Sequence, residues 1–75
     1  MKLVLVEWED SRLITDGWHN KDMVVETITC VSIGVQTLDD GKYVVVTPNL
    51  NSDHYCQDIA IPKSAIKRIR QLKLS

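Results

Sequence analysis

Apolar and polar positions follow each other in short runs that have the period of strands rather than of helices. Leu3 to Trp8 is a run of valine and leucine that ends at an acidic cluster, and Tyr43 to Val46 is a second β-branched run. Runs of this kind predict strands near residues 2–8, 24–38, 42–48 and 54–61.

Turn-forming residues separate these runs. Asp39-Asp40-Gly41 is a strong hairpin signal, and Asn49 to Asp53 is a second polar turn. Gly34 interrupts the long second run and predicts a break there, with a bulge or bend of the kind that closes small barrels.

The hydrophobic period changes after Pro62, a residue that is well tolerated in the first turn of a helix. Apolar side chains then recur at helical spacing, at Ala65, Ile66, Ile69 and Leu72. The pattern predicts a short helix near 63–73.

The order of these elements predicts one domain over residues 1–75, mostly β with one C-terminal helix. Its architecture is expected to be a small SH3-like or Sm-like antiparallel barrel, or a strongly bent sheet. Such folds leave strand edges open, and a small chain often covers them with another copy of itself, so a homo-oligomer is expected.

Composition agrees with a small globular domain, because 44% of the 75 residues are hydrophobic and 25% are charged. The net charge of −1 is unevenly distributed. Residues 1–62 hold four basic and ten acidic side chains, a net −6, whereas residues 63–75 hold five basic side chains and no acidic one. This basic end is either a solvated helix face that complements the helix dipole or an anion site.

The N-terminal apolar run stops at Glu7, which is too short for a signal peptide, and no run is long enough to span a membrane. A cytoplasmic protein is therefore expected. Cys30 and Cys56 are then expected to be reduced, buried structural thiols, with a bridge between strands as the second choice.

No catalytic set is recognisable, so no enzyme activity and no cofactor are expected. His54 and Cys56 lie two apart on one strand face, with Asp58 beyond them and His19 elsewhere, but the spacing does not match a zinc motif. No metal site is predicted. The three isolated glycines form no phosphate-binding loop.

Two polar clusters remain as candidate ligand-binding sites. Trp18, His19, Asn20 and Lys21 place a ring, an imidazole, an amide and a cation in one loop. The second cluster consists of Asn49, Asn51, Ser52, His54 and Tyr55. An aromatic ring beside amides and cations is how small folds hold nucleotides.

Four short motifs occur in a fixed order along the chain: Trp8-Glu9-Asp10-Ser11, Gly17-Trp18, Ser32-Ile33-Gly34 and Ile61-Pro62-Lys63. Their order resembles that of a group of short phage and prophage accessory proteins. The resemblance implies a compact, oligomeric counter-defence protein, which binds a host defence protein or sequesters a nucleotide immune signal between subunits.

The first hypothesis is therefore a non-enzymatic, phage-type binding module that holds a nucleotide-derived ligand between subunits. Its expected ligand-binding residues are Trp18, His19, Asn20, Arg12, Asn49, Asn51, His54, Tyr55, Arg68 and Arg70. One alternative is a protein–protein inhibitor of a host defence or nucleic-acid enzyme that uses an acidic strand face. A second alternative is a nucleic-acid-binding barrel that uses the basic helix, a partner we do not expect because the sequence pI is near 6.0.

Overall fold

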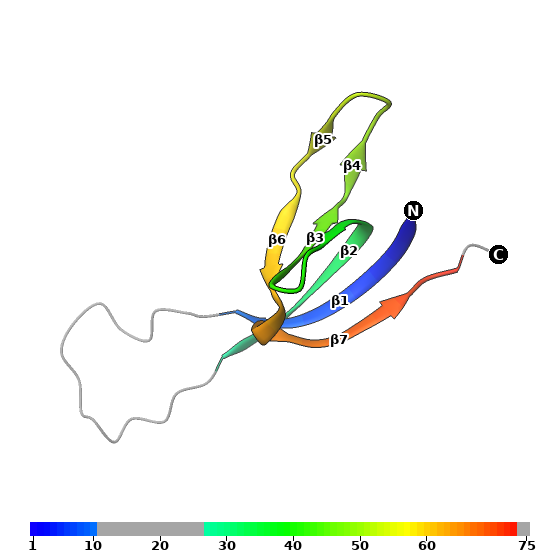
Figure 1. The fold of residues 1–75 in the computed structure, drawn as a ribbon. Coiled ribbons are helices and arrows are strands. Elements are labelled where there is room, and N and C mark those ends of the chain that lie inside the picture. Colours follow the sequence, from blue (N-terminus) through cyan, green and yellow to red (C-terminus); the bar gives the residue numbers. More distant parts are fainter. Residues whose placement is uncertain (11–26, 74–75) are drawn as a thin grey trace, which may run out of the picture.

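The computed structural model describes residues 1–10 and 27–73. Seven strands and one 3₁₀ turn follow each other along this part of the chain (Figure 1). In chain order they are β1 (Lys2–Asp10), β2 (Ile28–Asp39), β3 (Tyr43–Thr47), β4 (Asn49–Leu50), β5 (Tyr55–Cys56), β6 (Ile59–Pro62), η1 (Lys63–Ala65) and β7 (Ile66–Gln71). The prediction of a mostly β chain is confirmed.

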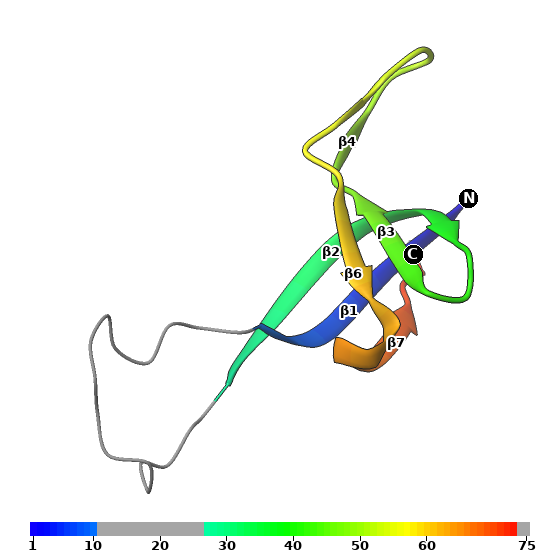
Figure 2. The ribbon, with the colours of Figure 1, turned by 60° about the vertical axis from the view of Figure 1, so that its left-hand side comes forward.

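Five of the strands form one antiparallel sheet in the order β6-β3-β2-β1-β7. The two short strands β4 and β5 pair only with each other, as a hairpin that extends away from this sheet (Figures 1 and 2). Strands β6 and β7 are the two edges, so within the described residues the sheet is open.

One small aliphatic core joins the strands. It consists of Val4, Val6, Val44, Val46 and Ile61, each at most 1% exposed. These side chains come from β1, β3 and β6, and β2 lies between β1 and β3. The sheet therefore bends around β2, which brings the core faces of its two halves together.

Small residues on β2 allow this bend. Gly34 lies opposite Val4 in the register with β1, and Ser32 lies opposite Val6. The strand runs through Gly34 without interruption, so the predicted break at this residue is wrong. The irregularity in the pairing of β2 with β3 comes two residues later, between Gln36 and Leu38.

The predicted C-terminal helix over 63–73 is also wrong. Residues Lys63–Ala65 form a single 3₁₀ turn, and Ile66–Gln71 is strand β7. Ile69 pairs with Val6 and Ile66 pairs with Trp8, while Lys67 has no partner on β1. This bulge places two isoleucines that are three residues apart on the same face of a strand, a spacing that resembles a helix in the sequence.

The predicted strand over 54–61 is divided in two. Tyr55–Cys56 belongs to the hairpin and Ile59–Pro62 to the main sheet. Between them Gln57 has a φ of 62°, in the left-handed region that interrupts a strand. The chain thus changes from one sheet to the other at this residue.

The burial of the two cysteines differs from the prediction. Cys30 and Cys56 are free, as expected, but Cys56 is exposed and Cys30 only partly buried, so neither is the buried thiol that was predicted. Among the described residues no helix has the length and apolarity needed to cross a membrane.

Candidate functional site

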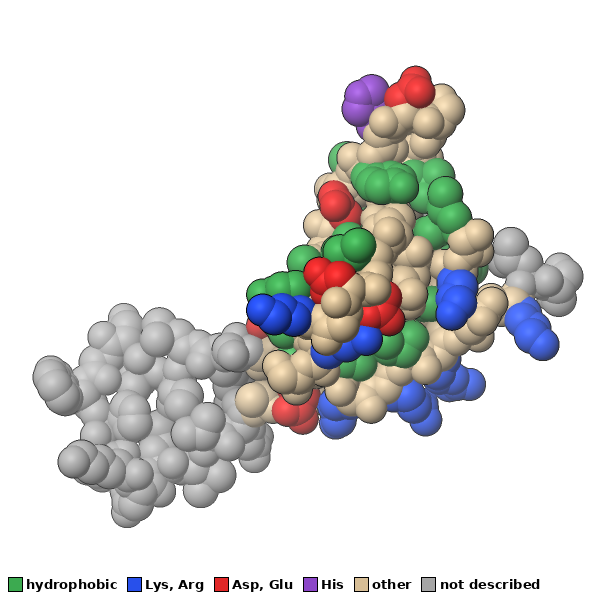
Figure 3. Space-filling view, viewed as in Figure 1, with side chains coloured by type: hydrophobic (Ala, Val, Ile, Leu, Met, Phe, Trp, Pro, Cys, Tyr) green, Lys and Arg blue, Asp and Glu red, His purple; other side chains and the backbone are tan. Residues whose placement is uncertain are grey.

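The β4–β5 hairpin carries a small, open hollow. It has a volume of about 160 Å³ and is lined by Asn49, Leu50, Asn51, His54 and Cys56. Figure 3 shows a histidine at the end of the hairpin, above a group of apolar side chains. Three predicted ligand-binding residues, Asn49, Asn51 and His54, therefore lie together.

Asn51 shapes the turn of the hairpin. Its side-chain Oδ1 accepts hydrogen bonds from the backbone N–H groups of Asp53, at 2.9 Å, and His54, at 2.8 Å. The backbone N–H of Asn51 in turn donates to the carbonyl oxygen of His54 at 3.0 Å. Because Oδ1 serves the turn, the Nδ2 amide group of Asn51 is the one that can donate to a ligand.

Asn49 is held by the other end of its side-chain amide. Its Nδ2 donates to the Oε1 of Gln57 at 3.0 Å, so its Oδ1 is the group that can accept a hydrogen bond. The hollow is thus lined by two amides, an imidazole, a thiol and Leu50. This combination suits the polar edge and apolar face of a heterocyclic ring.

Three other candidates, Tyr55, Arg68 and Arg70, do not join this hollow. Tyr55 pairs with Leu50 in the hairpin but does not line the hollow, and its side chain is 54% exposed. Arg68 and Arg70 lie on β7, at the edge of the main sheet opposite to β6. The Nη2 of Arg68 lies 3.4 Å from the Oε1 of Glu7, so this guanidinium is in an ion pair.

Arg12, Trp18, His19, Asn20 and Lys21 lie outside the described residues. Within residues 1–10 and 27–73 there is no group of three or more potential metal ligands, and His54, Cys56 and Asp58 do not form one.

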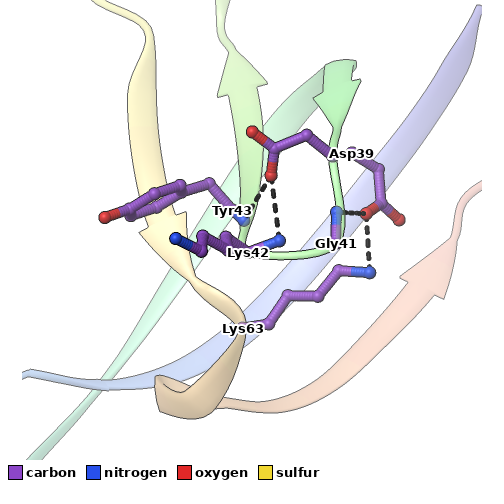
Figure 4. A network of polar contacts seen from close by, with 6 residues as sticks. Asp39, Gly41, Lys42, Tyr43 and Lys63 are labelled. Atoms are coloured by element: carbon purple, nitrogen blue, oxygen red, sulfur yellow. Dashed lines mark hydrogen bonds and ion pairs between the residues drawn. The ribbon is translucent and has the colours of Figure 1, made fainter.

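Among the described residues, two carboxyl groups have a clearly lowered pKa, and both belong to the turn between β2 and β3 (Figure 4). The Lys63 ammonium, 2.6 Å from Oδ1 of Asp39, lowers the pKa of Asp39 most, and the backbone N–H of Gly41 adds to this effect. The pKa of Asp40 is lowered by the backbone N–H groups of Tyr43 and Lys42. These shifts therefore reflect the structure of the turn rather than an acid–base site.

The exposed half of β2 was not predicted from the sequence. The side chains of Ile28, Val31 and Ile33 are 46%, 57% and 53% exposed. The sequence does contain an indication of it, because residues 27–38 have no charged side chain. An uncharged, β-branched strand without protection at its edge is unusual in a monomer.

Comparison with known proteins adds no relative. The chain matches no protein-family model, none of the curated proteins and none of the solved structures.

Proposed function

We propose that this protein is a non-enzymatic binding module that works as a homo-oligomer and holds a small nucleotide-type ligand at the β4–β5 hairpin. The observation that supports this proposal is the hairpin hollow, which is lined by Asn49, Asn51 and His54 together with Leu50 and Cys56. An amide donor, an amide acceptor and an imidazole recognise the edge of a base, and an aliphatic side chain packs against its face.

The size of the hollow supports a site between subunits. Pockets that enclose a whole drug-sized ligand are larger, about 300–1,000 Å³, whereas this one is about 160 Å³. One copy can therefore cover one ring, and a second copy has to cover the rest of a nucleotide. Arg68 and Arg70 lie on a different edge of the same chain, so they do not line the hollow of their own copy.

For the scaffold we propose an SH3-like barrel. Three features support it: the strand order β7-β1-β2-β3-β6, the single 3₁₀ turn between β6 and β7, and the core that joins both halves of the bent sheet. The phage counter-defence role that the sequence resemblance implies is compatible with such a module, which would withhold a host immune signal instead of converting it.

The two alternative functions have weaker support. An inhibitor that uses an acidic strand face relies on the carboxylates of β1, and two of the three are in ion pairs: Glu7 lies 3.4 Å from Arg68 and Glu9 lies 3.7 Å from Lys67. The nucleic-acid-binding barrel was expected to use the basic helix, but Ile66–Gln71 forms an edge strand instead.

Ligand-induced stabilisation tests the proposal. The purified protein is heated with cyclic nucleotides and ADP-ribose derivatives, and a rise in Tm with ligand concentration is expected because binding stabilises the folded state. His54→Ala should reduce this rise. Asn51→Asp should reduce it as well, since it keeps the Oδ1 acceptor of the turn but removes the Nδ2 donor.

Tyr43→Phe serves as the control, because Tyr43 lies on β3 outside the hollow. It should leave the ligand effect unchanged. The absence of any Tm shift with all of these compounds at saturation would exclude a nucleotide-type ligand. An unchanged shift in both hairpin variants would place the site elsewhere.

A further inference from the structure

Half of β2 has an open edge. On one side the whole strand, from Ile28, pairs with β1. On its other side the pairing with β3 begins only at Val35, opposite Thr47. After Thr47 the chain turns away at Pro48 into the hairpin, so within the described residues no strand pairs with this side of β2 between Ile28 and Ile33.

Within the described residues this open edge lacks the features that usually protect one. Edge strands of monomeric proteins generally carry a charge, a proline or a bulge that blocks pairing with another chain. The segment Ile28–Ile33 has no charged residue and no proline, and its pairing with β1 is regular. Its exposed side chains at Ile28, Val31 and Ile33 are β-branched, which favours strand pairing.

The other two edges of the main sheet are protected. Lys67, Arg68 and Arg70 lie on β7, so a second β7 placed beside it would bring like charges together. The edge strand β6 ends in Pro62, which has no N–H to donate. Charge and hydrogen-bonding capacity thus select β2 as the edge that can accept a copy of itself.

We propose that two copies of this chain associate by antiparallel pairing of β2 with β2 along Ile28–Ile33. A two-fold axis through this segment makes the same residues serve both partners, as in most homodimers. The interface continues the sheet from one copy into the next and covers Val31 and Ile33. The inference rests on the self-association in the proposed function and assigns it a surface.

The position of this edge agrees with a ligand site between subunits. A second β2 occupies the place beside β2 that β3 leaves at Thr47. The β4–β5 hairpin leaves the main sheet at the same point, after Pro48. The second copy therefore lies next to the base of the hairpin that carries the hollow.

The test measures molecular mass in solution without any ligand, by light scattering and sedimentation over a wide range of protein concentration. The wild type is expected to be a dimer that dissociates on dilution. Val31→Lys and Ile33→Lys should be monomeric at concentrations where the wild type is dimeric, because each places a charge at the paired edge.

Leu38→Lys is the matched control. Leu38 belongs to the same strand and is 47% exposed, but it already pairs with Val45 of β3. This variant should remain dimeric. A wild type that is monomeric at every concentration would overturn the proposal, and so would a dimer that persists in Val31→Lys and Ile33→Lys or dissociates equally in Leu38→Lys.

Hydrogen exchange on the wild-type protein tests the β2–β2 pairing without depending on the folding of any variant. Backbone amides in 28–33 should exchange more slowly as the protein concentration rises, while those in β7 should not change. Concentration-independent exchange in 28–33 contradicts the proposal. A dimer that forms through β2 but binds no nucleotide would support this inference and remove only the ligand from the proposed function.

Discussion

A β-carbon placed on Gly34 would lie 2.6 Å from the backbone carbonyl oxygen of Thr47 and 3.0 Å from Cγ1 of Val46. The backbones of β2 and β3 thus approach each other where the sheet bends and β3 ends. Because Gly34 faces the core opposite Val4, it also gives the valines of β1 and β3 room to meet. This one residue connects the local strand geometry with the shape of the whole sheet.

Gly34→Ala is therefore expected to destabilise the protein by about 1–3 kcal/mol, the usual cost of an overpacked core position. The measurement is urea unfolding followed by circular dichroism. Thr29→Ala is a control on the same strand, since Thr29 is exposed in the single chain, and in the monomer it should change the free energy of unfolding little. Equal stability of Gly34→Ala and the wild type would show that Thr47 moves away without cost.

The core is small enough that one isoleucine carries a large share of it. Ile61 is 1% exposed and packs among the valines of β1 and β3. Ile61→Ala should lower the free energy of unfolding by ~2–5 kcal/mol, which combines the lost burial with the cavity left behind. In a protein of this size such a loss can leave a substantial unfolded fraction at room temperature.

Ile28→Ala is the matched control, because the residue types are the same and Ile28 is 46% exposed. Its effect in the monomer should be within about 0.5 kcal/mol, as for an ordinary surface substitution. Comparable losses in both variants would show that the core is not centred on Ile61.

The sequence predicted the turn between β2 and β3 but not the strand β7. The β2–β3 turn was recognised from Asp39-Asp40-Gly41 because its chemistry is local: Asp40 accepts from the backbone of the turn, and Gly41 has a φ of 93°. The strand β7 was mistaken for a helix because the bulge at Lys67 changes the apolar spacing. Only the partner strand β1 fixes that bulge, so no local pattern could show it.

The candidate site was predicted in part, for the same reason. Asn49, Asn51 and His54 come together because a short hairpin turn connects them, and the sequence shows such turns. Arg68 and Arg70 were grouped with them on charge alone. Their true position depends on the pairing of β7 with β1, a contact between residues about 60 positions apart.

A hydrogen bond between β1 and β2 gives a further test of the bent sheet. The indole Nε1 of Trp8 donates to the Oγ of Ser32 at 3.0 Å in a partly buried place. Ser32→Ala removes the acceptor and should cost about 1 kcal/mol in the free energy of unfolding. Ser32→Thr keeps a hydroxyl group and should retain most of the stability.

A double-mutant cycle with Trp8→Phe separates this bond from packing. The coupling energy between the two positions should be about 0.5–1.5 kcal/mol. Strictly additive effects of Trp8→Phe and Ser32→Ala would indicate that the two side chains do not interact in solution.

Acid should weaken the protein through the turn between β2 and β3. In the folded protein the pKa of Asp39 lies below its ordinary value of 3.8, mainly because of Lys63, and the pKa of Asp40 is lowered by backbone N–H groups. The unfolded chain therefore binds protons more readily than the folded one in this range. The stabilisation is fully present above pH 3.8 and is lost as the pH falls through the lower, folded values.

Thermal unfolding from neutral pH to strongly acidic pH measures this effect. The wild-type Tm should decrease below about pH 4, whereas Asp39→Asn should have a lower Tm at neutral pH and a smaller decrease in acid. Lys63→Gln should resemble Asp39→Asn, because it removes the largest cause of the shift. Asp58→Asn, outside this network, should keep the wild-type profile. If Asp39→Asn and the wild type lose equal Tm in acid, the carboxylate of Asp39 does not stabilise the turn.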